Sequence, residues 1–226
     1  MENVLVLAPH PDDEVIGCGG TIAGQNVNAL VIFGTVGGVK QYRGDHKEER
    51  DLQTAVDEIN AAASVLGFLW RPIDMQTGPA TSLDSLTQKY LMDTILGIVQ
   101  EVVFEDGLLD TVFIPSPAAH QDHRAMYNAG LAVSHVLCYR FGVKRFYCYD
   151  SGYYGWNPSD AIHPTVFRKL LQDQVDKKLE AMRCYESQIG RGAIFSPEFI
   201  LEGLKRNGAL VGAEFAEVFS LIREVA

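Results

Sequence analysis

The sequence VLVLAPHPDDE, residues 4–14, joins an apolar segment directly to a polar one. The short run Val4 to Leu7 is rich in branched apolar residues, which is typical of a strand buried on both faces of a parallel sheet. One histidine, His10, and three consecutive acids at 12–14 follow within a few positions, with a proline on each side of the histidine. The stretch therefore predicts a buried strand that delivers several ionisable side chains to one end of a sheet.

Outward from this stretch, apolar runs and helical periodicities alternate along the chain. We expect further strands near residues 29–33, 69–73, 111–114 and 145–149, helices near 14–23, 45–67, 86–104, 122–141, 169–187 and 197–206, and loops near 35–38, 78–82 and 152–158. Strands that alternate with helices favour a mostly parallel sheet covered by helices. The glycines at 17, 19 and 20 indicate that the first helix packs closely on this sheet. No repeat or linker is visible, so we interpret residues 1–226 as one α/β domain.

The composition is that of a globular protein, since 47% of the 226 residues are hydrophobic and 21% are charged. The formal net charge of -10 argues against nucleic acid and anionic membrane surfaces as partners. The sequence contains no apolar run that could span a bilayer, and its start does not resemble a signal peptide, so we expect a cytoplasmic location. The 4 cysteines are not spaced as CxxC pairs, so a metal site would use histidine and carboxylate ligands.

A second polar cluster, AAHQDH at residues 118–123, follows the strand expected at 111–114. Ligands in α/β folds bind beyond the carboxyl ends of the strands, so both clusters should face the same crevice. His10 and Asp13 are three positions apart across a turn, and His123 can supply a third ligand. Two histidines and one carboxylate suit Zn²⁺ and leave a coordination position for water. The same ligands could also hold another divalent ion such as Fe²⁺.

The remaining polar residues of the two clusters have chemical roles open to them. Asp12 could accept the proton of an attacking water, and His120 could stabilise an oxyanion or protonate a leaving amine. Asp122 could orient His120 and raise its pKa. Glu14 is equally well explained by the dipole of the helix that it begins. Helix capping is a competing explanation for the acids, but it does not account for His10 or for the second cluster.

Several motifs resemble those of a known enzyme family. PHPDDEVIGCGG, residues 9–20, resembles the (A/P)HPDDExxGxGG motif of the LmbE-like, or PIG-L-like, N-deacetylases, and HQDH, residues 120–123, is similar to their HPDH motif. Thr35-Val36-Gly37 resembles the T-x-G that follows the second strand of the family. The resemblance continues towards the C-terminus at Lys178, Ala181, Tyr185, Ser187, Gln188 and the AEVF of residues 216–219. It thus touches nearly the whole chain in the expected order.

The resemblance implies a Rossmann-like three-layer fold and a zinc-dependent hydrolase that removes acetyl groups from N-acetylglucosamine units. From their positions in the motifs, it implies that His10, Asp13 and His123 are the zinc ligands. It further implies that Asp12 is the general base, and that His120 acts on the oxyanion or on the leaving amine.

The sequence also departs from the family pattern. Gln121 replaces the proline of the second motif, between two residues that carry the chemistry. The family often carries Arg-x-x-Glu in its second helix, and here Glu58 fits the glutamate while Ala55 occupies the arginine position. Arg50 lies about one and a half turns away and is carried over as a substrate-binding candidate.

The expected partner is a small amino sugar or a glycoconjugate. One alternative is an amidase that acts on a different amide, such as a thiol conjugate. Another is a sugar- or nucleotide-binding module without catalysis. Tyr153, Tyr154 and Trp156 could line a sugar site or pack in the core. The identity of the sugar and the oligomeric state, including a homo-oligomer, stay open.

Overall fold

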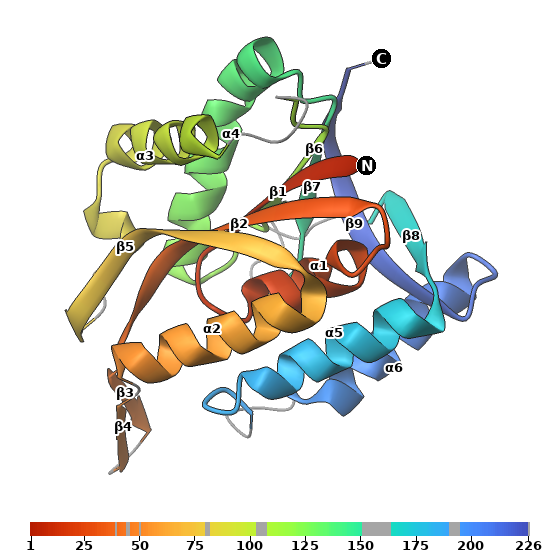
Figure 1. The fold of residues 1–226 in the computed structure, drawn as a ribbon, viewed down its shortest axis with the longest axis horizontal. Coiled ribbons are helices and arrows are strands. Elements are labelled where there is room, and N and C mark those ends of the chain that lie inside the picture. The colour runs from red at the N-terminus through yellow and green to blue at the C-terminus, as the bar shows by residue number, and fades with distance from the viewer. Residues whose placement is uncertain are drawn as a thin grey trace.

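Figure 1 presents a computed structural model of the chain, which describes residues 1–38, 40–43, 46–49, 51–79, 82–102, 108–150, 164–189 and 195–225. The strands are β1 (Glu2–Ala8), β2 (Val27–Gly38), β3 (Lys40–Arg43), β4 (His46–Glu49), β5 (Phe68–Pro79), β6 (Thr111–Pro115), β7 (Arg145–Tyr149), β8 (Val166–Leu170) and β9 (Phe215–Glu224). The helices are α1 (Asp13–Ile22), α2 (Leu52–Leu66), α3 (Gln88–Glu101), α4 (Gln121–Phe141), α5 (Gln172–Cys184) and α6 (Pro197–Leu210), with a short 3₁₀ helix η1 (Leu83–Ser85).

The main sheet of the described residues has 7 strands in the order β5-β2-β1-β6-β7-β9-β8. All pairs from β5 to β7 are parallel, whereas β9 runs antiparallel to both β7 and β8. The prediction of a mostly parallel sheet covered by helices is therefore confirmed. Strands β3 and β4 form a separate antiparallel pair beside the start of α2 (Figure 1).

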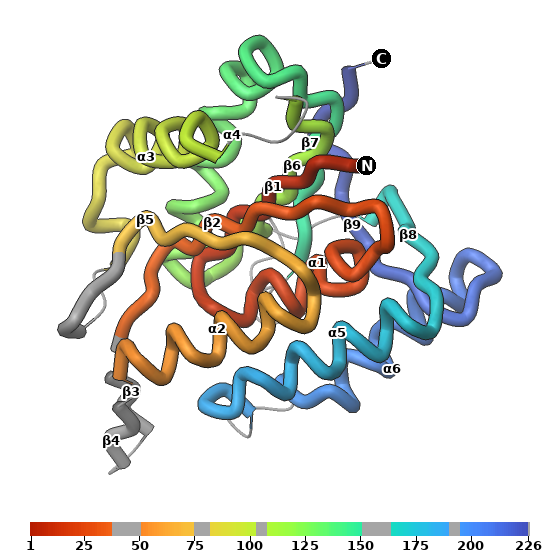
Figure 2. The backbone as a smooth tube through the Cα atoms, viewed as in Figure 1, coloured from red at the N-terminus to blue at the C-terminus, as the bar shows by residue number. Residues whose placement is uncertain are grey.

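Helices cover both faces of the sheet, which gives three layers. Helices α1, α2, α5 and α6 lie on one side, and α3 and α4 lie on the other, as the backbone traces of Figures 1 and 2 show. Side chains of β1 point alternately to the two faces of the sheet. Val4 and Val6 pack in the core under α1, α2, α5 and α6, whereas Leu5 and Leu7 pack in the core under α3 and α4, and all four are fully buried. No helix in the described part of the chain is long and apolar enough to cross a membrane.

Three of the expected elements differ from the structure, one because of a local helix cap and two because of strand pairing. The helix expected from residue 45 begins only at Leu52, because the Asp51 carboxylate caps it by accepting a hydrogen bond from the backbone N–H of Thr54 at 2.7 Å. The helix expected from residue 169 begins at Gln172, because the preceding residues pair with β9 as the edge strand β8. The loop expected at 35–38 continues β2, since residues there pair with β5. The loop expected at 152–158 lies outside the described residues.

The glycines of α1 allow close packing, as their positions predicted. A Cβ atom on Gly17 would overlap the ring of Tyr149, and one on Gly20 would overlap the side chain of Leu170. Replacing either hydrogen by a methyl group would therefore displace a neighbour on the sheet. These glycines serve the packing of the helix that begins at the first motif.

A buried ion pair holds the far end of α1. The Glu217 carboxylate accepts hydrogen bonds from the backbone N–H groups of Gly20 and Thr21, each at 2.7 Å. Lys178 lies 2.5 Å from Glu217 and also donates to the carbonyl of Ile16 at 2.8 Å. Both side chains are buried, with Lys178 1% exposed and Glu217 2% exposed, and each has more than one hydrogen-bond partner. Removing one partner of such a pair leaves the other charge buried without compensation, which strongly destabilises the fold.

We predict that Lys178→Met destabilises the protein strongly. The variant leaves the buried Glu217 carboxylate without its cation, which costs about 3–5 kcal/mol of unfolding free energy. Urea denaturation followed by circular dichroism measures the change. Lys89→Met is the matched control, because Lys89 pairs with Asp93 on the surface of α3 and its loss should have little effect. Equal losses of stability in the two variants would contradict the role given to the buried pair.

Candidate metal centre

The topology brings the two polar clusters together. From β1 the chain proceeds to β2 and β5 on one side, and it then returns to β6 on the other side of β1. The carboxyl ends of β1 and β6 therefore lie at the point where the strand order reverses, which is where open α/β sheets bind ligands. Residues 10–13 follow β1, and residues 120–123 follow β6.

A tight turn at the end of β1 orients the first cluster. The Asp13 N–H donates to the carbonyl of His10 at 3.3 Å, which closes a four-residue turn with Pro11 in its second position. Asp12, in the third position, has φ 117° and ψ -29°. Proline in second place and a positive φ in third place are the features of a type II turn, although the third residue there is usually glycine or asparagine. The turn explains why a proline precedes the pair of aspartates.

The Asp13 carboxylate is the point where the two clusters meet. Its Oδ2 atom accepts the backbone N–H of His10 at 3.0 Å and lies 3.5 Å from Nδ1 of the same residue. The same oxygen lies 3.3 Å from Nε2 of His123, which is fully buried in the first turn of α4. One ligand atom from each of His10, Asp13 and His123 lies within 4.8 Å of the others. The predicted ligand residues are thus neighbours in space.

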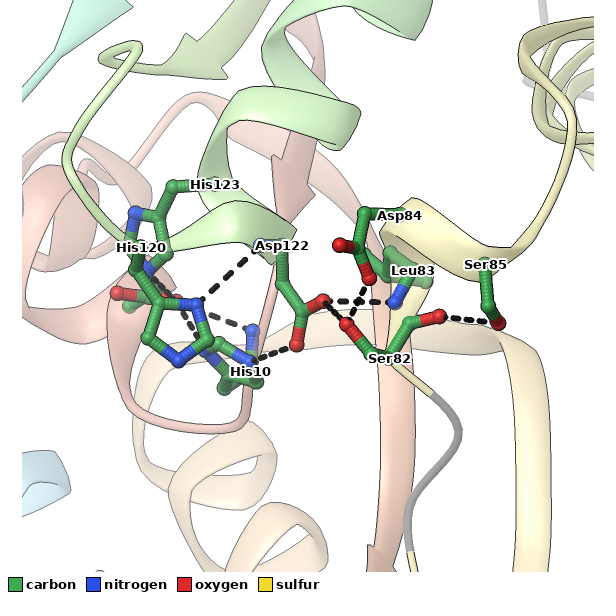
Figure 3. A network of polar contacts seen from close by, with 9 residues as sticks. His10, Ser82, Leu83, Asp84, Ser85, His120, Asp122 and His123 are labelled. Carbon is green, nitrogen blue, oxygen red and sulfur yellow. Dashed lines mark hydrogen bonds and ion pairs between the residues drawn. The ribbon is translucent and has the colours of Figure 1, made fainter.

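Asp122 connects His10 to the turn that begins η1 (Figure 3). Its Oδ2 atom lies 2.9 Å from Nε2 of His10. Its Oδ1 atom accepts hydrogen bonds from the backbone N–H of Leu83 at 2.6 Å and from the Ser82 hydroxyl at 2.9 Å. Because a carboxylate only accepts, His10 carries a proton on Nε2 and turns Nδ1 towards Asp13. A carboxylate behind a histidine in this way orients ligands in many metal sites.

The charges of the site strongly favour a cation between the acids. Burial alone would lower the pKa of His10, but hydrogen bonds and charges from Asp122 and Asp13 outweigh it and raise the pKa to about 10. Burial would likewise raise the pKa of Asp13, but the charges and hydrogen bonds of His123 and His10 hold it well below its usual range. Both shifts arise from the attraction between the buried carboxylates and the protonated imidazole rings, which water screens only weakly.

His120 stands at the boundary between β6 and α4, where it is the N-cap residue. Its Nδ1 atom accepts the backbone N–H of Asp122 at 3.3 Å, so the neutral ring carries its proton on Nε2. Burial and the neighbouring His10 lower the pKa of His120 to about 4, and the opposing effect of Asp122 is smaller. The ring lies 4.9 Å from that of His10 and edge-on to it. His120 can therefore donate a hydrogen bond while uncharged.

Asp122 was predicted to be the partner of His120, and the two residues are in contact through the backbone of Asp122. The hydrogen bond between the two residues comes from the backbone N–H of Asp122, and the carboxylate lies against His10. That the carboxylate orients His120 stays a prediction. The contacts to Ser82 and Leu83 had no signal in the sequence, since these residues belong to a short turn without a motif.

Asp12 and Glu14 complete the first cluster. Asp12 is 6% exposed, and its side chain does not cap α1. Glu14 is fully buried, and burial raises the pKa of its carboxyl to about 7 against the opposing hydrogen bonds of Tyr185 and the Asp12 backbone. The dipole of α1 is thus not the whole explanation of Glu14, since an acid that only favours a dipole has no need of burial.

The donor set fits a divalent metal. Two histidine nitrogens and one carboxylate oxygen at these separations match the ligands of open catalytic Zn²⁺ sites, and the buried negative charge calls for a cation. The other candidates for ligand binding are not placed. Arg50, Tyr153, Tyr154 and Trp156 lie outside the described residues.

Comparisons with known proteins point to deacetylases. The family model PIG-L, described as GlcNAc-PI de-N-acetylase, matches residues 5–134. A relative from Bacillus anthracis, named probable N-acetyl-alpha-D-glucosaminyl L-malate deacetylase 2, is 29% identical over 192 residues, which are 82% of this chain and 81% of the relative.

Solved structures share the fold at lower identity. N,N'-diacetylchitobiose deacetylase from Pyrococcus horikoshii has a TM-score of 0.68 at 22% identity, covering 98% of this chain and 84% of its own. GalB, a 4-carboxy-2-hydroxymuconate hydratase from Pseudomonas putida KT2440, has a TM-score of 0.70 at 20% identity, covering 100% and 98%. At these identities the likeness shows the fold alone, and the fold carries both a deacetylase and a hydratase.

We predict that the protein, purified without chelator, binds about one divalent metal ion per chain, as an open site with three protein ligands would. His10→Ala and His123→Ala should each lose it, since each removes one of the three ligands. Asp122→Asn should weaken metal affinity by about 10- to 100-fold, as loss of an orienting carboxylate does. Elemental analysis and competition with a chromogenic chelator measure both effects. Full metal content in His123→Ala would show that the two clusters do not form one site.

Proposed function

The chain belongs to the PIG-L family, whose model is described as GlcNAc-PI de-N-acetylase, and from this premise we propose that it is a metal-dependent hydrolase that removes the N-acetyl group from an amino sugar or its glycoconjugate. The observation that carries the proposal is the convergence of His10, Asp13 and His123 on one point, with Asp12 and His120 next to them in sequence. The family model and the relative from Bacillus anthracis are both named as deacetylases of N-acetylglucosaminyl compounds. An acetamide is the shared chemical group of these substrates.

In the proposed mechanism, His10, Asp13 and His123 hold the metal ion. We favour Zn²⁺, because two histidines and one carboxylate are among its usual catalytic ligand sets. A divalent metal at this position supplies Lewis-acid chemistry, since it acidifies water and polarises a carbonyl group. Asp122 keeps the Nδ1 face of His10 directed towards the ion through its hydrogen bond to Nε2.

Asp12 acts as the general base. It is buried and adjacent to the ligand Asp13, so it can accept a proton from the attacking water. The water oxygen bonds to the acetyl carbon, and the bond from that carbon to nitrogen then breaks. Acetate and the free amino sugar leave, and the amine receives from Asp12 the proton that Asp12 took from the water.

His120 stabilises the negative charge that develops on the acetyl oxygen. Its neutral ring carries the proton on Nε2, because Nδ1 accepts the backbone N–H of Asp122. A hydrogen bond from a neutral donor held in place needs no prior protonation of the ring. This assignment differs from a charged imidazolium, which the lowered pKa of His120 disfavours through burial and the neighbouring His10.

Two features favour amide hydrolysis over the other reactions considered. The fold is shared with a hydratase, so the fold does not choose the reaction, but the sequence relative of 29% identity is named a deacetylase. A binding module without catalysis would have no need for a buried aspartate next to a metal ligand, because taking a carboxyl group out of water costs free energy. An amidase for larger acyl groups would use the same residues with a wider pocket.

We predict that Asp12→Asn lowers kcat for acetate release by about 10²- to 10⁴-fold, because an amide cannot take the proton of the water. Metal content should be unchanged, since the ligands are intact. Substrates for the assay are N-acetylglucosamine, N,N'-diacetylchitobiose and N-acetylglucosaminyl malate, with acetate measured enzymatically. Asp93→Asn, which replaces an exposed carboxylate on α3, is the control and should keep full activity.

Each other outcome of this assay decides against a part of the proposal. Release of acetate by Asp12→Asn at the wild-type rate would contradict the role of Asp12. Release of larger acyl groups in preference to acetate would favour the alternative amidase. Binding of the sugars without turnover by the metal-loaded wild type would favour the binding module, and hydration of an unsaturated acid would favour the hydratase.

A further inference from the structure

The backbone of Asp12 is held in an unfavourable conformation. Among the described residues it is the one non-glycine residue with positive φ, at 117°. Side chains with a Cβ atom avoid this region, and they occupy it only where surrounding contacts fix it. The residue in question is the proposed general base, whose carboxyl must be aimed accurately. The contacts that fix its backbone therefore bear on the reaction.

A buried chain of two hydrogen bonds supplies the fixing contacts. The backbone N–H of Asp12 donates to Oε2 of Glu14 at 3.0 Å. The hydroxyl of Tyr185 donates to Oε1 of the same carboxyl at 2.5 Å. Glu14 and Tyr185 are both 0% exposed. Tyr185 follows the last turn of α5, so the chain links the helix of the C-terminal motif to the first motif.

A helix-dipole role does not explain this arrangement. A first-turn acid interacts with the dipole from an exposed position and requires no distant partner. Glu14 is instead enclosed, and its partner lies 171 positions away in the sequence. Its two oxygens are divided between Asp12 and Tyr185, so the tyrosine fixes the carboxyl and the carboxyl fixes the turn. Asp13 stabilises the same turn from the other side by accepting the N–H of His10.

We propose that Tyr185 and Glu14 are positioning residues for Asp12. The Tyr185 hydroxyl orients the Glu14 carboxyl, which holds the Asp12 N–H and with it the positive φ that aims the Asp12 side chain. The inference rests on the proposed role of Asp12 as general base. Both positioning residues are fully enclosed in the protein, so their loss should act on kcat and leave binding of the substrate and of the metal in place.

Three substitutions separate positioning from plain stability. Glu14→Met keeps the size of the side chain and removes both oxygens, and it should lower kcat by about 100-fold, as small misplacements of catalytic groups do. Tyr185→Phe removes one hydroxyl and should lower kcat by about 10-fold, because Glu14 keeps its bond to Asp12. Glu14→Gln retains an oxygen for the Asp12 N–H and a polar group for Tyr185, so it should stay within about threefold of the wild type. KM and metal content should change little in all three.

Ser187→Ala is the matched control for Tyr185→Phe. It lies two positions further along the same segment, and it also removes a hydroxyl that donates to a glutamate, here Glu58 on α2 at 2.7 Å. We expect a similar loss of thermal stability and an unchanged kcat. Equal kcat values in Tyr185→Phe and Ser187→Ala would overturn the proposal. So would a Glu14→Gln variant as slow as Glu14→Met.

A crystal structure of the Tyr185→Phe and Glu14→Met variants tests the inference without any assay. We expect the φ of Asp12 in Glu14→Met to leave the positive region, and the Glu14 carboxyl in Tyr185→Phe to rotate. An unchanged Asp12 backbone in Glu14→Met would overturn the proposal, and if that variant does not fold, an unchanged Glu14 in Tyr185→Phe would do so. Failure of the proposed function is a separate result, since it would appear as undiminished turnover in Asp12→Asn.

Discussion

The buried carboxylate of Asp13 is the interaction on which the site depends. One of its oxygens lies within 3.5 Å of His10 and of His123, which come from two segments more than a hundred residues apart. A carboxylate removed from water requires compensating positive charge or hydrogen bonds. The histidines meet this requirement in the structure, and a divalent cation bound at the same point would meet it as well. The parallel pairing of β1 and β6 brings the two segments to one edge of the sheet, and the buried charge then holds both histidines against the carboxylate.

The remainder of the fold supports this point in successive layers. Residues next to the ligands hold them in place, as Asp122 does by joining His10 to the turn at Ser82. A deeper layer holds α1 itself, through the buried pair of Lys178 and Glu217 at its far end. The residues near the C-terminus thus serve the motif near the N-terminus. Helix α5, which carries Lys178, packs beside α1 (Figure 1).

The sequence was sufficient to predict the parallel part of the sheet, from β5 to β7, and the meeting of the two clusters, but not the antiparallel strands β8 and β9. Each cluster follows a short apolar run, and parallel strands bring such ends to one edge, so the nearness of His10 and His123 follows from topology. The partners of Glu14 and of Asp122 could not be predicted in this way. The contact of Glu14 with Tyr185 depends on how two helices pack, and the bonds of Asp122 depend on a turn with no sequence pattern. Pairing between distant strands also overrode local helical periodicity at β8.

Anomalous diffraction at the zinc absorption edge, from crystals grown with Zn²⁺, tests the central claim most directly. We predict one strong peak at about 2.0–2.2 Å from a nitrogen of His10, a nitrogen of His123 and an oxygen of Asp13, the distances usual for such ligands. Asp122 should still lie against Nε2 of that first histidine, with the metal on the other ring nitrogen. A peak held by only one of the two clusters, or by neither, would contradict the account.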